Sequence, residues 1–157
     1  MKLLAALIAA LALTGAANAS TGIPAADALI ARNAPAATVS CDPGLDNRNA
    51  GETVIPTGQV SLASYVCVGL LLWQADAAWR PAFLAANPQI RTVADSLIGV
   101  GVLVALHESF HAAGNPDETA VECAALAAAP AYLTAEQLRY AHAYDATLSA
   151  AYHAHPC

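Results

Sequence analysis

The sequence is poor in positive charge. It has 6 lysine and arginine residues against 12 aspartate and glutamate residues, and its only lysine is Lys2, so the formal net charge is −6. Surfaces that bind nucleic acids or anionic membranes carry an excess of basic residues. The charge balance therefore argues against either as the main partner, and no stretch combines basic with aromatic residues.

Other absences narrow the function further. The chain has no glycine-rich phosphate loop and no Gly-x-Ser-x-Gly sequence, so it lacks the common signatures of nucleotide binding and of serine hydrolysis. It has no internal repeat and no low-complexity linker. Its 157 residues leave room for one domain.

No apolar run in the mature chain is long enough to cross a bilayer, which takes about 20 residues. Asp95 bounds the run that precedes His107 and leaves about 11 apolar residues. We therefore expect a buried core helix there and no stable membrane span.

Residues 1–19 have the pattern of a cleaved signal peptide. Lys2 precedes an apolar stretch, Leu3 to Leu13, and Ala17 and Ala19 form a small-x-small cleavage site before Ser20. No cysteine follows that site, which argues against a lipoprotein. We expect a secreted protein whose residues 20–157 form one globular domain.

Four cysteines lie in the mature part, and no Cys-x-x-Cys spacing favours a metal cluster. In a small exported domain they indicate two disulfides, with three pairings open. We favour Cys41–Cys67 and Cys123–Cys157, of which the second would attach the C-terminal tail to a helix.

Alanine dominates the composition and favours helix. We predict a mainly α, compact, disulfide-stabilised domain with an irregular or short-strand part at 20–60 and a helical part at 61–157. Short strands are expected at Ala37–Cys41 and Thr53–Ile55. Helices are expected at about 61–78, 87–113, 115–129 and 134–153. Ser61 would cap the first helix. The second could break and restart before residue 97, and Gly114 would end it.

The sequence His107-Glu108-Ser109-Phe110-His111 fits the HExxH pattern. On a helix, residues four apart share a face, so both imidazoles can bind one ion, and neutral imidazole suits Zn²⁺. Glu108 stands beside that ion, where it can accept a proton from water as a general base.

A catalytic zinc site takes a third protein ligand, and Asp117, Glu118 and Glu122 are the candidates. The string HESFHAAGNPD resembles the metzincin pattern with Asp117 in the last ligand position. Metzincins also require a downstream methionine, and the only methionine is Met1, which disfavours Asp117. Glu118 and Glu122 lie four apart on the next expected helix.

The stretch LVALHESFHAAGNPDETAVECAAL resembles a segment of small exported actinobacterial proteins, and more distantly the ImmA/IrrE-type minimal gluzincins. The gluzincin resemblance implies that Glu118 binds zinc and that Glu122 orients His107, although the reverse order stays open. It also implies a disulfide at Cys123 and specifies no substrate.

We therefore expect a secreted zinc-dependent metallopeptidase that acts on a peptide or protein substrate. A non-catalytic zinc-stabilised binding domain is the alternative, because no edge strand is evident to align a peptide. A third reading is a disulfide-held interaction protein without metal. The last helix is expected to cover the site, and it offers Tyr140, His142, Tyr144, Tyr152 and His153 as oxyanion donors, though packing is the commoner role for such residues.

Overall fold

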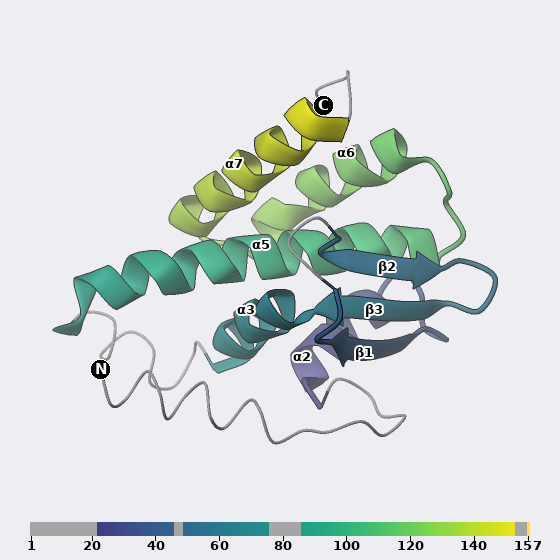
Figure 1. The fold of residues 1–157 in the computed structure, drawn as a ribbon, viewed down its shortest axis with the longest axis horizontal. Helices are drawn as coiled ribbons and strands as arrows, with labels where there is room; N and C mark the ends of the chain where they lie inside the picture. The colour runs from purple at the N-terminus through teal and green to yellow at the C-terminus, as the bar shows by residue number, and fades with distance from the viewer. Residues whose placement is uncertain (1–21, 46–48, 76–85, 153–156) are drawn as a thin grey trace.

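The computed structural model describes residues 22–45, 49–75, 86–152 and Cys157 (Figure 1). The predicted signal peptide and Pro81 lie outside these residues. The described part contains five α-helices, a short 3-10 helix and a three-stranded sheet, which confirms the predicted mainly α, disulfide-stabilised fold. In chain order these are α2 (Pro24–Ala31), β1 (Thr38–Asp42), β2 (Gly51–Val54), β3 (Gln59–Ala63), α3 (Ser64–Gln74), α5 (Pro88–Ala112), α6 (Glu118–Ala128), η2 (Ala129–Ala131) and α7 (Ala135–Tyr152).

Helix α5 is the central element, and α2, α3, α6, α7 and the sheet all pack against it. By length and composition it could cross a membrane, but 61% of its most apolar window is buried inside the fold. Its apolar character therefore follows from packing on all sides. The break before residue 97 that the sequence left open does not occur. Helix α5 is continuous, and Asp95, buried within it, accepts a hydrogen bond from Gln137 Nε2 of α7 at 3.1 Å.

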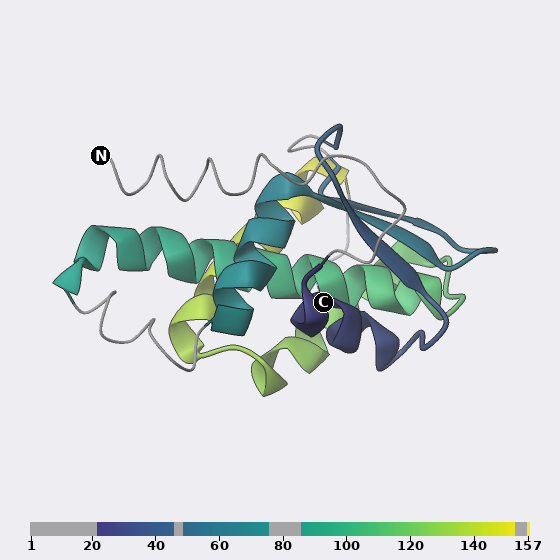
Figure 2. The ribbon, with the colours of Figure 1, turned by 90° about the horizontal axis from the view of Figure 1, so that it is seen from below.

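Helix α3 crosses α5 at a steep angle (Figure 2). The two backbones approach closely where Gly69 of α3 meets Leu97 and Gly101 of α5. A Cβ atom on Gly69 would lie 2.0 Å from the carbonyl oxygen of Leu97. Absence of side chains at this crossing is what allows the helices to pack so tightly.

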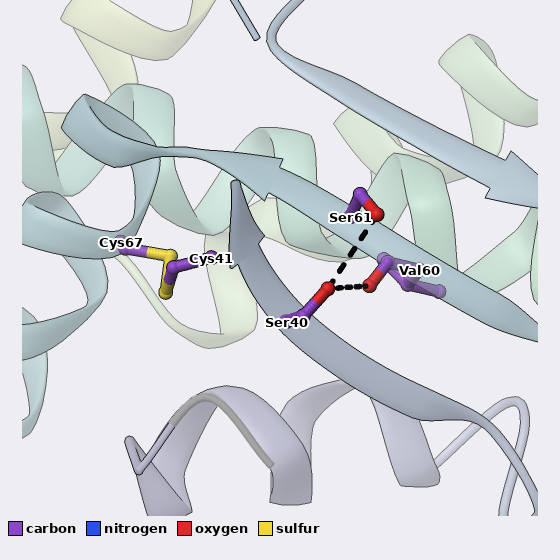
Figure 3. The surroundings of a disulfide bond; sticks show 5 residues. All are labelled: Ser40, Cys41, Val60, Ser61 and Cys67. Atoms are coloured by element: carbon purple, nitrogen blue, oxygen red, sulfur yellow. Dashed lines mark hydrogen bonds between the residues drawn. A yellow bond between two sulfur atoms is a disulfide. The ribbon is translucent and has the colours of Figure 1, made fainter. Parts of the chain in front are cut away.

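The sheet has the strand order β1-β3-β2, with β1 parallel and β2 antiparallel to β3. Figure 3 shows the disulfide Cys41–Cys67, which joins β1 to α3, and the hydroxyl of Ser40, which donates to the Val60 carbonyl at 3.4 Å. Both strands predicted from the sequence are present, within two residues of the expected bounds.

The prediction that Ser61 caps a helix was wrong. Ser61 lies in β3, its hydroxyl is 3.5 Å from that of Ser40, and α3 begins only at Ser64. Val60 and Leu62 are both fully buried and flank it, so the alternating pattern of a strand extends through this position. The apolar residues that follow belong to the helix.

Helix α6 runs back along the end of α5 (Figure 1). Gly114 has φ of 99° and ends α5 as expected. The next helix begins at Glu118 instead of Asn115, because Asp117 is its cap and accepts a hydrogen bond from Ala120 N at 2.9 Å. The disulfide Cys123–Cys157 attaches the chain end to α6, so both favoured pairings are confirmed.

Candidate metal centre

Three side chains from α5 and α6 converge at one point. His107 Nε2 lies 3.0 Å from His111 Nε2 and 3.2 Å from Glu118 Oε2, and His111 Nε2 lies 3.3 Å from the same oxygen. Four ligands at 2.0–2.1 Å around a tetrahedral zinc ion are separated by roughly 3.3 Å. The triangle of donor atoms therefore has the size that such an ion requires.

This His-His-Glu group is the only cluster of three or more potential metal-binding side chains within the described ranges. Glu118 is the first residue of α6, and its side chain is 56% exposed. That position follows directly from the Gly114 turn and the Asp117 cap, which reverse the chain over the last turn of α5. The predicted ligands His107, His111 and Glu118 are thus brought together in a group that can hold a metal ion.

The orientation of His111 is fixed from its far side. Its Nδ1 lies 2.7 Å from the backbone carbonyl oxygen of Asn115, which can only accept a hydrogen bond. Nδ1 therefore carries the proton, and in the neutral ring the lone pair of Nε2 points at the triad. A carbonyl behind a ligating histidine is a common arrangement at metal sites.

Glu108 is buried beside the triad, with 5% of its surface exposed. Burial raises its pKa from 4.5 to about 7, and the nearby carboxylates of Glu118 and Glu52 act in the same direction. A hydrogen bond from Thr53 and the proximity of His111 oppose that rise. A carboxyl group with such a pKa can both accept and release a proton near neutral pH.

Residues of strand β2 contact the carboxyl group of Glu108. The sequence did not predict this contact. Thr53 Oγ1 donates to Glu108 Oε2 at 2.6 Å. A Cβ atom on Gly51 would come within 2.6–2.8 Å of the Glu108 carboxyl group, so only glycine leaves room for it. These residues are more than fifty positions apart in the chain, and the separation shows no regular spacing from which the contact could be inferred.

The other acidic candidates have different positions. Asp117 caps α6 and is not part of the triad. Glu122 is 8% exposed and lines the same cavity as the triad, one turn further along α6. The structure therefore places Glu118 in the group that could hold a metal ion and leaves Glu122 close to it.

The triad opens into a cavity of about 400 Å³ between β2, α5, α6 and α7. Of the last helix, Tyr144 and Asp145 line it, in agreement with the expectation that this helix covers the site. The Tyr144 hydroxyl lies 3.2 Å from that of Tyr65, and burial raises its pKa. Tyr140 instead stacks against Arg139, and the side chains of Tyr152 and His153 lie outside the described part.

Comparison with protein-family models, curated proteins and solved structures gives no match for this chain. The resemblance to gluzincins therefore stays a prediction, and the case for a function depends on the geometry of the site.

Proposed function

We propose that this protein is an exported zinc-dependent peptidase. The observation that carries the proposal is the buried carboxyl group of Glu108 beside a His-His-Glu triad of the size that zinc requires. A purely structural zinc site is closed by four protein ligands, whereas a catalytic site has three and one open position. Three ligands facing a cavity favour the catalytic kind.

The residues present can divide the work of peptide hydrolysis among them. His107, His111 and Glu118 would hold the ion, which supplies Lewis acidity by polarising a carbonyl and making water a stronger acid. Glu108 takes the proton from the attacking water and then gives it to the leaving amine. Thr53 keeps one carboxylate oxygen in place and leaves the other available.

Strand β2 supports a peptide as the substrate. It is an edge strand of the sheet, and five of the cavity-lining residues come from Ala50–Thr53 and Ile55. An extended peptide can add to such an edge through main-chain hydrogen bonds. This corrects the expectation from the sequence that no edge strand would be evident.

Export is the second part of the proposal. Two disulfides indicate an oxidising, extracellular-type environment. The signal-peptide pattern of residues 1–19 gives the route by which the chain would reach it.

Metal analysis of untagged protein tests the zinc site. We expect about one zinc per chain, lost in His107→Ala and in Glu118→Gln. Asp117→Asn is the matched control, because it removes a neighbouring carboxylate that caps α6. It should keep zinc and leave the stability of the fold nearly unchanged, because asparagine caps a helix about as well as aspartate. Zinc-free wild-type protein would refute the site.

Hydrolysis is tested separately with Glu108→Gln, assayed against a broad library of peptides by mass spectrometry. The variant should keep zinc and lose cleavage, while wild type cleaves. If zinc-loaded wild type is as inert as the variant, the protein is a zinc-stabilised binding domain and the peptidase proposal fails.

A further inference from the structure

The cavity beside the triad is strongly acidic. Its lining carboxylates come from four elements of the fold: Glu52 of β2, Glu108 of α5, Glu118 and Glu122 of α6, and Asp145 of α7. No lysine or arginine of the described residues lines it. Even with Glu108 protonated, four carboxylates remain, and a divalent ion would offset only two of their negative charges, so the cavity stays negative when the metal is bound.

Three of the carboxylates, Glu52, Glu122 and Asp145, have no part in the chemistry proposed above. Glu52 and Asp145 belong to β2 and α7, which each pack against α5. Glu52 is exposed and Asp145 is half-buried, so both keep access to solvent and to a bound molecule. Like charges gathered around one cavity raise the local concentration of ligands of opposite charge.

Part of the remaining lining is apolar. Leu103 and Val104 of α5, Ala125 of α6 and Ile55 after β2 belong to this apolar part, whereas Asn49, Thr53 and Tyr144 add polar groups. A lysine or arginine side chain combines an apolar stem with a charged head, and it can place the stem along such a wall while its head meets carboxylates. A small inorganic cation would gain nothing from the apolar part.

We propose that the substrate is a peptide that places a lysine or arginine side chain in this cavity, next to the bond that is cleaved. The triad and the cavity define the site, and the carboxylates with the apolar wall define the class of side chain. The cleavage in this inference rests on the proposed peptidase function. The preference for a cation belongs to the cavity and can be measured without turnover.

The test measures binding to zinc-loaded Glu108→Gln, which should bind without cleaving. The probes are three pools of dye-labelled hexapeptides with blocked termini, identical except for one fixed residue: arginine, its uncharged isostere citrulline, or glutamate. Fluorescence anisotropy should show the arginine pool binding at least about tenfold more tightly than the citrulline pool, or about 1.4 kcal/mol. The glutamate pool should bind most weakly, and added salt should reduce the difference.

Charge-removing variants locate the preference. Glu52→Gln and Asp145→Asn, each made in the Glu108→Gln background, should lower the ratio of arginine-pool to citrulline-pool affinity severalfold. Glu136→Gln is the matched control, since it removes a carboxylate from α7 that pairs with Arg139 and does not line the cavity. Equal binding of arginine and citrulline pools would overturn the inference, and so would equal losses in Asp145→Asn and Glu136→Gln.

A second arm keeps the two proposals apart. Cleavage of the same pools by wild type should rank them as binding does. If no pool is cleaved and the arginine preference persists, the peptidase function fails and the cation-binding cavity stands. If cleavage occurs without any charge preference, the peptidase stands and the cavity inference fails. A fourth pool with a free N-terminus shows whether an amino-terminal ammonium can replace the arginine side chain.

Discussion

Glu108 makes stability depend on pH at the scale of a single residue. Its pKa is raised from 4.5 to about 7 in the fold, chiefly by burial. Between these values the folded chain holds a proton that the unfolded chain has lost. Its contribution is therefore most favourable below pH 4.5 and is lost as the pH rises to about 7.

We expect metal-free wild type to lose on the order of 3 kcal/mol over that interval relative to Glu108→Gln, which cannot ionise. Urea unfolding of both proteins at several pH values in the presence of a chelator measures the difference. Parallel stability curves from pH 4.5 to 7 would show that Glu108 does not hold its proton in the fold.

Thr53 gives a second prediction at this scale. Thr53→Val keeps the shape of the side chain and removes the donor to Glu108 Oε2. A hydrogen bond to a charged group contributes about 1.5–3 kcal/mol, so kcat should fall roughly 10- to 100-fold with little change in KM. Thr53→Ser retains the hydroxyl group and should restore most of the loss. A Val variant as active as wild type would deny Thr53 this positioning role.

The sequence predicts the triad but not its support. His107 and His111 follow from helical periodicity. The short turn after them makes Glu118 and Glu122 both candidates, and the order between the two came from the gluzincin resemblance. Thr53 and Gly51 reach Glu108 only through the pairing of β2 with β3 and its packing on α5. Such contacts depend on the whole fold, and neither residue type by itself indicates a role beside a carboxylate.

At the scale of elements, the crossing of α3 and α5 depends on Gly69. Gly69→Ala would place a Cβ atom against the Leu97 carbonyl oxygen, which is backbone and cannot rotate away. Forcing the helices apart should lower the free energy of unfolding by about 1–3 kcal/mol. Thermal unfolding checks this. Gly22→Ala controls for loss of a glycine alone, since its Cβ meets nothing within 4 Å, although its φ of 65° adds some strain.

The helices α5, α6 and α7 were predicted within a few residues, because alanine-rich apolar stretches and the Gly114 stop are strong local signals. The start of α3 was misplaced by three residues, since Ser61 suits a helix cap as well as a strand. The sequence left open whether α5 continues through Asp95, because Gln137, which donates a hydrogen bond to this carboxylate, comes from another helix.

At the scale of the whole molecule, the two disulfides join distant parts of a small domain. Cys41–Cys67 spans 26 positions and Cys123–Cys157 spans 34. Restricting loops of this length in the unfolded chain stabilises the fold by roughly 3–4 kcal/mol for each disulfide. We expect the paired serine variants to lose about that much in urea unfolding. Under reducing conditions wild type should be no more stable than these variants, because its own disulfides are then open. A difference that persists there would show that the serine substitutions weaken packing instead.

The space that Gly51 leaves for Glu108 should also make these two positions co-vary in evolution. A lineage that keeps an acid at 108 should favour glycine at 51, because a side chain there would shift the carboxyl group from its present place. A lineage that lost the acid would be free to vary at 51. The two positions should therefore tend to change together among descendants of this chain, and an alanine or serine at 51 should coincide with a moved or replaced side chain at 108.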